Sequence, residues 1–289
     1  MRLGAVFPQA EFTRVEPDEI IGFVHALEDA GYDHLLVFDH VLGADSGSRP
    51  GWPGAYDHED PFLEPLVLFA YLARECNLEL VTDVLVLPQR QTALVAKQTA
   101  TLELLAPGRL RLGVGIGWND VEYEALGQPF GTRAARIEEQ IALLRRLWTE
   151  DTLDHRGATD TVPAAGIAPR PARQIPIWIG CAGDPRATAR VGRLADGWLP
   201  MPQLQPGRGF EDAWASVRAG ALDAGRDPDT LGLEGHVWAR ADAPERVVDG
   251  VTRWRDAGAQ SVAVNPLRAD AAWPDGHLEV LRRAAELLR

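Results

Sequence analysis

Short apolar runs and amphipathic segments alternate along the whole chain. The apolar runs carry hydrophobic side chains at consecutive positions, which is typical of parallel strands that are buried on both faces. Between them, hydrophobic residues recur at helical spacing, as at Ile20, Val24 and Leu27. The expected strands cover residues 2–7, 35–38, 78–87, 109–117, 175–180, 197–199, 231–239 and 261–264. The expected helices cover residues 18–31, 66–74, 92–105, 137–148, 186–195, 210–224, 247–257 and 278–288.

This rhythm predicts an α/β protein of the (β/α)8 TIM-barrel class. A barrel needs about eight strand–helix units, and a chain of 289 residues has room for them. No linker or shift in composition divides the sequence, so we expect a single domain over residues 1–289. Two stretches interrupt the alternation and are interpreted as insertions. One follows the second strand, at residues 43–65, and the other is the irregular, proline-bearing stretch 150–174.

Composition limits the partners and sites that this chain can have. Its formal net charge of −13 disfavours nucleic acid and anionic membranes, so a small molecule is the expected partner. No apolar run reaches membrane-spanning length and no signal peptide is recognisable, which favours the cytoplasm. The two cysteines, Cys76 and Cys181, are far apart in sequence. The seven histidines lack metal-ligand spacing, so neither a disulfide framework nor a metal site is expected.

The most distinctive expected strand, residues 109–117, ends in three alternating glycines. Gly113, Gly115 and Gly117 should share one face of this strand. A face without side chains allows tight packing against neighbouring strands, or it leaves a floor for a flat ligand. The polar segment that follows at once favours the ligand floor. A dinucleotide fingerprint is a weak alternative, because Trp118 occupies the position of its third glycine.

Ligands of such barrels bind at the carboxyl ends of the strands, so the residues that end each strand are candidates. Asp39 and His40 follow the second strand, where an imidazole over the mouth could donate a hydrogen bond or a proton. The alternative is a surface turn in which Asp39 caps the next segment. Asp83 lies between Thr82 and Val84 in an otherwise apolar run. Its carboxylate needs either a local structural hydrogen bond or a ligand.

A loop of small residues follows the fifth apolar strand. Gly180, Cys181, Ala182 and Gly183 lead into a helix that begins at residues 184–185. Free N–H groups at a helix N-terminus favour an anion site there, and a plain turn with a good N-cap is the alternative. Cys181 as a nucleophile is disfavoured, because no histidine is near it in sequence.

A series of motifs runs in a fixed order from the N-terminus to about residue 200. They are Phe38-Asp-His40, Leu85-Val-Leu-Pro88 with Arg90, Ala96-Lys-Gln98, Ala100-Thr-Leu-Glu103, Gly108 to Trp118, Glu122, Leu144-Arg-Arg-Leu-Trp148, Pro176-Ile-Trp-Ile-Gly180 and Ala195-Asp-Gly-Trp198. Each motif is weak alone, but their order and spacing are specific. Together they resemble the luciferase-like monooxygenase superfamily, in particular its coenzyme F420-dependent oxidoreductase branch.

The resemblance implies a flavin or deazaflavin across the C-terminal mouth of the barrel and hydride transfer between C5 of the deazaflavin and an organic substrate. His40 is the first choice for the acid or base and Glu122 the second. The resemblance also implies that Asp39 and His40 lie near the ring, that Gly115 lies beside it, and that Thr82, Asp83 and Val84 form a bulge behind it with a cis peptide at Asp83–Val84. It further implies that the phosphate of the coenzyme tail is held by the loop residues Gly180, Cys181, Ala182 and Gly183. The anionic tail would be attracted by Arg186 and Arg190. The two insertions would contact the substrate. A homodimer is expected at the family level only.

Three departures from the family pattern stand in this chain: residues 91–92 are Gln-Thr instead of Asn-Pro, residues 106–109 read Ala-Pro-Gly-Arg, and Asp83 replaces a glycine. The main alternative function is an FMN-dependent monooxygenase fed by a separate flavin reductase, which is disfavoured because such enzymes tend to be longer. A non-catalytic protein that binds a deazaflavin or flavin is disfavoured by Asp39, His40 and Glu122. An unrelated barrel hydrolase or aldolase is disfavoured because no metal cluster and no suitable Schiff-base lysine are recognisable.

Overall fold

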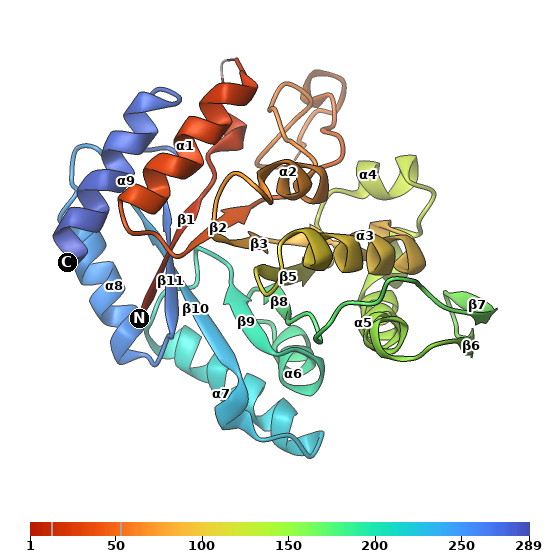
Figure 1. The fold of residues 1–289 in the computed structure, drawn as a ribbon. Helices are drawn as coiled ribbons and strands as arrows, with labels where there is room; N and C mark the ends of the chain where they lie inside the picture. The colour runs from red at the N-terminus through yellow and green to blue at the C-terminus, as the bar shows by residue number, and fades with distance from the viewer. Residues whose placement is uncertain (13, 53) are drawn as a thin grey trace.

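The computed structural model describes residues 1–12, 14–52 and 54–289, and its strands close into a barrel surrounded by helices (Figure 1). Neighbouring strands follow the order β3, β2, β1, β11, β10, β9, β8, β5, and the barrel closes because β5 also pairs with β3. All of these pairings are parallel. The predicted (β/α)8 barrel is therefore confirmed.

The barrel strands and their helices alternate as the sequence pattern indicates. The strands are β1 (Arg2–Val6), β2 (His34–Val37), β3 (Glu79–Thr82), β5 (Leu110–Gly115), β8 (Ile177–Cys181), β9 (Gly197–Pro200), β10 (Gly232–Trp238) and β11 (Ser261–Asn265). The helices that cover them are α1 (Pro17–Asp29), α2 (Pro65–Leu72), α3 (Thr92–Leu105), α5 (Arg133–Thr149), α6 (Pro185–Leu194), α7 (Arg208–Asp223), α8 (Arg246–Asp256) and α9 (Asp275–Leu288). No helix in the described part of the chain is long and apolar enough to cross a membrane.

Local sequence sets several helix boundaries. Pro17, Pro65 and Pro185 each lie in the first turn of a helix, where no backbone N–H is needed. Gly225 and Gly258 follow the ends of α7 and α8 with positive φ angles, a conformation that glycine adopts without strain.

Three segments differ from the sequence-based expectation. The run 78–87 is not one strand, because it breaks after Thr82 and resumes as the short β4 (Leu85–Val86), which pairs with the end of β5. The stretch 150–174 is not wholly irregular, since β6 (Leu153–Arg156) and β7 (Thr161–Ala165) form an antiparallel hairpin. This hairpin projects from the side of the barrel near α5 (Figure 1). The helix α4 (Asp120–Ala125) was not expected.

Alternate residues of the strands face the inside of the barrel. A small apolar layer of Val6, Leu36, Val81, Ala263 and Leu267 lies there, separate from the larger core between the sheet and the helices. Toward the amino ends of the strands, the same inner face carries charged side chains instead. The barrel interior is therefore polar at one level and apolar at the next.

Candidate active site

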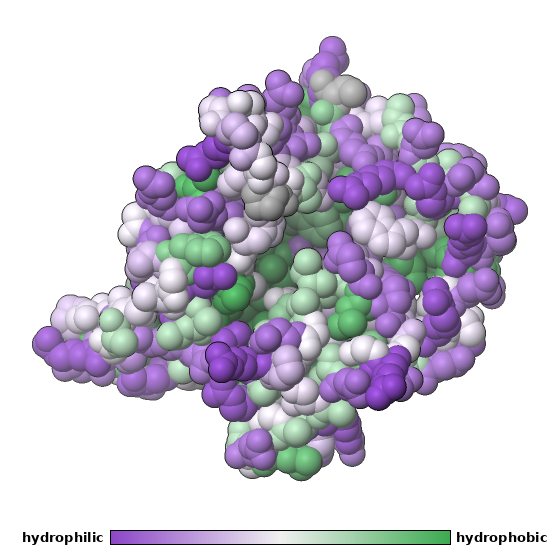
Figure 2. Space-filling model, turned by 180° about the vertical axis from the view of Figure 1, so that it is seen from behind, coloured by the Kyte–Doolittle hydropathy of each residue, from purple (hydrophilic) through white to green (hydrophobic). Residues whose placement is uncertain are grey.

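The molecule is hollowed at the face where the carboxyl ends of the barrel strands open. Figure 2, seen from behind Figure 1, shows this hollow near the centre, with hydrophobic residues on its floor and a mostly hydrophilic rim. In barrels of this kind, ligands bind at this end of the strands. The candidate site is therefore built from the segments that follow each strand.

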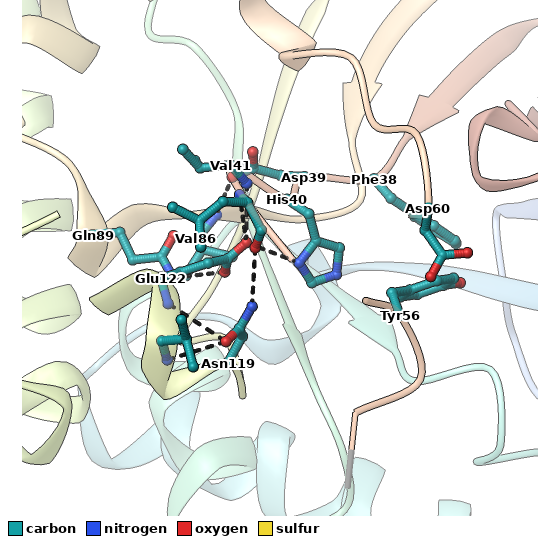
Figure 3. A network of polar contacts seen from close by, with 12 residues as sticks. Phe38, Asp39, His40, Val41, Tyr56, Asp60, Val86, Gln89, Asn119 and Glu122 are labelled. Atoms are coloured by element: carbon teal, nitrogen blue, oxygen red, sulfur yellow. Dashed lines mark hydrogen bonds and ion pairs between the residues drawn. The ribbon is translucent and has the colours of Figure 1, made fainter. Parts of the chain in front are cut away.

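A buried carboxylate holds the histidine that follows β2. Glu122 on α4 accepts hydrogen bonds from Nδ1 of His40 at 3.1 Å, from Nε2 of Gln89 at 2.9 Å, and from the backbone N–H groups of Val41 at 2.9 Å and Leu42 at 3.4 Å (Figure 3). Burial tends to raise the pKa of Glu122, but the hydrogen bonds from His40 and Gln89 outweigh it and lower that pKa. Glu122 is therefore an anion at neutral pH.

This arrangement fixes the tautomer of His40. An ionised carboxylate only accepts hydrogen bonds, so Nδ1 of His40 must carry the proton that it shares with Glu122. The second ring nitrogen, Nε2, points away from Glu122 and has no hydrogen-bond partner among the described residues (Figure 3). Of the two residues predicted as acid or base, His40 and Glu122, His40 therefore has a ring nitrogen free for a ligand. Glu122 is engaged in holding this ring and the backbone after it, which favours a positioning role, and its ranking as the second acid or base remains a prediction.

Aromatic rings surround His40. The ring centroids of Phe62, Trp118 and Tyr56 lie 4.7, 5.4 and 5.5 Å from that of His40. Trp52 contacts Trp118 in turn, at 5.7 Å. Tyr56, Phe62 and Trp52 come from the insertion after β2, so this insertion lies beside His40, and its contact with a substrate remains a prediction. The hairpin β6–β7 is different, because His155 on β6 bonds Glu139 on α5, on the side of the barrel.

Asp39 has a structural role. Its side chain is buried, and its two oxygens accept hydrogen bonds from the backbone N–H of Val86 at 2.9 Å and from Arg90 at 2.6 Å. Arg90 also pairs with Glu64 at 3.4 Å. Asp39 therefore ties the end of β2 to β4 and does not face the hollow. Of the pair Asp39 and His40, His40 is the residue that is available to a ligand.

The bulge between β3 and β4 is present as the resemblance implies. The Asp83–Val84 peptide is cis, which confirms the expected link. Thr82 is buried, and its hydroxyl donates a hydrogen bond to the carbonyl of Gly113 at 2.6 Å. Thr82 thus holds the bulge against β5 and is closed to a ligand.

The space beside the glycines at the ends of β5 and β8 is occupied by other residues of the protein. A Cβ at Gly113 would lie 1.9 Å from the carbonyl oxygen of Thr82, and a Cβ at Gly115 or Gly180 would lie 2.5 Å from a methyl group of Val84. Gly117 meets Val86 in the same way. The expectation of a bare ligand floor is therefore wrong in its direct form, because the glycines make room for the bulge. Val84 is then the side chain that the bulge presents.

The loop before α6 ends in a capped helix start. The carboxylate of Asp184 accepts hydrogen bonds from the backbone N–H groups of Arg186 and Ala187, both at 3.0 Å. These donors were expected to serve a phosphate, and a negative charge already occupies them. The interpretation of Gly180, Cys181, Ala182 and Gly183 as an anion site therefore remains a prediction, in which the first N–H groups of α6 have no part. Burial raises the pKa of the Cys181 thiol to about 12, which agrees with its being no nucleophile.

One of the two arginines expected to attract an anionic tail is already paired. Arg190 is largely buried and bonds Glu138 at 2.9 Å, which Arg193 also contacts at 3.0 Å. Arg186 is exposed. Arg186 alone of the pair is open to an anion.

Sequence reasoning missed a charged cluster inside the barrel. Arg111 on β5 bonds Glu234 on β10 and Glu79 on β3, and Nε2 of His34 on β2 lies 2.5 Å from Glu234. Arg111 also lies over the ring of Trp178, at 4.5 Å. The alternation of strand faces could have indicated this cluster, because Arg111 lies on the same face of β5 as Gly113 and therefore points into the barrel.

The sequence of this chain matches a known protein family along most of its length. The family model for luciferase-like monooxygenases matches residues 1–276. The chain belongs to this family. The suspected resemblance is thereby confirmed, and the barrel mouth is the place where the members of such a fold class carry their chemistry.

Three known proteins illustrate the likeness. An uncharacterized protein of Mycobacterium tuberculosis is 34% identical over 254 residues, which are 84% of this chain and 83% of that protein. An F420-dependent glucose-6-phosphate dehydrogenase of Nakamurella multipartita is 31% identical over 74% of this chain and 61% of its own length. A solved F420-dependent secondary alcohol dehydrogenase, with an F420–acetone adduct, has a TM-score of 0.80 at 17% identity, covering 100% of this chain and 99% of its own. Solved monooxygenases share the fold at TM-scores of 0.76 and 0.77.

Proposed function

We propose that this protein is a coenzyme F420-dependent oxidoreductase that transfers a hydride between the deazaflavin and a small organic substrate. The observation that carries the proposal is the pair of His40 and Glu122, which leaves one imidazole nitrogen free at the mouth of the barrel. The names of the relatives support F420 as the coenzyme, since several are F420-dependent dehydrogenases.

The residues at the mouth fit a flat ring. Val84 is seated between Gly115 and Gly180, and it presents an apolar side chain as backing for one face of a ring. The aromatic side chains around His40 form an apolar wall beside it. When bound there, the deazaflavin supplies the carbon that accepts or donates the hydride.

The free nitrogen of His40 handles the proton that accompanies the hydride. If the substrate is an alcohol, Nε2 accepts the hydroxyl proton as the carbon loses its hydride, and in the reverse direction it returns that proton to the oxygen. Glu122 holds the proton on Nδ1, so Nε2 is the ring nitrogen that faces a substrate. The same carboxylate stabilises the imidazolium that forms. Trp118, Tyr56 and Phe62 limit the access of water to this nitrogen.

The test separates binding from proton transfer. F420 is titrated into wild type and into His40→Asn, followed by coenzyme fluorescence, and reduction of F420 is then screened with small alcohols and reduction by F420H2 with small carbonyl compounds. The expected result is unchanged F420 binding in the variant with turnover lowered about 100-fold or more, the range for loss of a general acid or base. His25→Asn is a matched control, because His25 is exposed and bonds only the carbonyl of Glu75. Tight binding of FMN instead of F420, with oxygen consumption, would contradict the proposal and favour the monooxygenase alternative.

A further inference from the structure

Asp83 lies inside the barrel at its open end. On β3, Glu79 and Val81 face the interior, since Glu79 bonds Arg111 and Val81 belongs to the inner apolar layer. Asp83 is the next residue of this alternation. Its backbone N–H donates to the carbonyl of Val37 at 2.8 Å, which fixes its place beside the end of β2. The side chain is partly exposed, and its carboxyl group has no hydrogen-bond partner within residues 1–12, 14–52 and 54–289.

Glu234 and Glu79 in the barrel interior both have cationic partners. Arg111 bonds the two carboxylates, Arg2 also pairs with Glu79 at 2.7 Å, and His34 contacts Glu234 from the opposite side. His236, the remaining titratable group on this face of β10, is neutral at pH 7 because burial lowers its pKa to about 4. Asp83 adds a third carboxylate to this group without adding a cation. It is the unpaired acid, and it lies at the end that opens to the mouth.

We propose that Asp83 takes up a proton when the ring of the bound coenzyme is reduced, and releases it when the ring is oxidised. The inference rests on the proposed function. A hydride that arrives on the ring brings two electrons and one proton, so it adds one negative charge to the site. An ionised Asp83 next to the ring-backing residue Val84 opposes that charge. A proton from water then forms an O–H bond with the Asp83 carboxylate and restores the local charge, while no electron moves at Asp83.

The surroundings of Asp83 suit this exchange near neutral pH. Burial raises the pKa of Asp83 to about 7, with a further rise from Glu234 and a smaller opposing effect of Arg111. His34, Glu79 and His236 complete the titratable groups on the inner faces of the neighbouring strands. A carboxyl group that is half protonated at pH 7 responds to one added charge with the largest change in proton occupancy.

Asp83→Asn tests the proposal, because asparagine keeps the shape of the side chain and removes its titration. The dissociation constants of oxidised and reduced F420 are measured for wild type, Asp83→Asn and Asp120→Asn from about pH 5.5 to about pH 8.5. Ionisation of the coenzyme itself is common to all three proteins and cancels in the comparison. Asp120 is an exposed carboxylate at the start of α4 and serves as the matched control.

The measured quantity is the ratio of the dissociation constants of reduced and oxidised F420. In wild type and in Asp120→Asn, this ratio should rise from about pH 5.5 to about pH 8.5 by about tenfold more than it does in Asp83→Asn. A tenfold change is the effect of one unscreened like charge a few ångströms away. An equal pH dependence in wild type and Asp83→Asn would overturn the inference and leave the proposed function intact. Absence of F420 binding in wild type at every pH would overturn both.

Discussion

The raised pKa of Asp83 predicts how the folding stability of the protein without ligand depends on pH. A carboxyl group with a pKa of 3.8 in the unfolded chain and about 7 in the folded protein prefers its neutral form when folded. The unfolded state therefore releases its proton first as the pH rises. Folding stability is lost between about pH 4 and about pH 7, and above that range the loss is complete.

The size of this effect follows from the two pKa values. Each pH unit between them corresponds to about 1.4 kcal/mol, so the full loss is about 4 kcal/mol. Solvent reaches the carboxyl group from the mouth, which screens part of the interaction. We therefore expect Asp83→Asn to be more stable than wild type by about 2 to 4 kcal/mol at pH 8, and by about half as much or less at pH 5.

Urea denaturation followed by circular dichroism measures this difference. The midpoint should rise in Asp83→Asn at pH 8 with an unchanged slope, because the exposed area of unfolding is the same. Asp120→Asn should follow wild type at both pH values, since this carboxylate is exposed. A constant difference between wild type and Asp83→Asn at all pH values would refute the reasoning. A wild type that gains stability over Asp83→Asn as the pH rises would do so too, because it would mean that Asp83 is a stabilised anion.

Other predictions concern the rest of the site. Gly180→Ala should displace Val84, because the new Cβ would lie 2.5 Å from a Val84 methyl group. This change should weaken F420 binding about tenfold or more in fluorescence titrations. In the control Gly183→Ala, the new Cβ would have its nearest neighbour at 3.5 Å, so F420 should bind normally. Asp39→Asn should lower the free energy of unfolding by about 3 kcal/mol in urea denaturation, because it leaves Arg90 without its buried partner; a loss under about 0.5 kcal/mol would contradict this role. Glu122→Gln should lower kcat about 10- to 100-fold while the dissociation constant of F420 changes little, and equal losses in both would refute a positioning role.

The sequence predicts the barrel well because its helices are long and periodic and its strands are continuous apolar runs. Residues 92–105, expected as a helix, are α3 with the same bounds. Short elements were missed for lack of such a signal: α4 has six residues, and β7 is mostly exposed and contains a proline. The break in the run 78–87 was visible only as the polar Asp83 among apolar neighbours. The homodimer and the cytoplasmic location remain predictions.

The site was predictable in its members but not in their roles. His40 and Glu122 stood out as polar residues after strands, yet they are 82 positions apart, so their hydrogen bond needed the folded chain. The sequence did not show that Asp184, which marks the start of α6, also accepts hydrogen bonds from the N–H groups of Arg186 and Ala187. The charged interior was not foreseen because Arg111 and Glu234 are separated by 123 positions.

Equilibrium titration of the purified protein with F420, and separately with FMN, tests the central claim most directly. Coenzyme and tryptophan fluorescence report on binding, since Trp118 and Trp52 lie at the mouth. The account predicts binding of F420 in the range of about 1 to 10 µM with much weaker binding of FMN, and a loss of F420 affinity in Gly180→Ala. Binding of FMN alone, or of neither molecule, would contradict the assignment of the barrel mouth as a deazaflavin site.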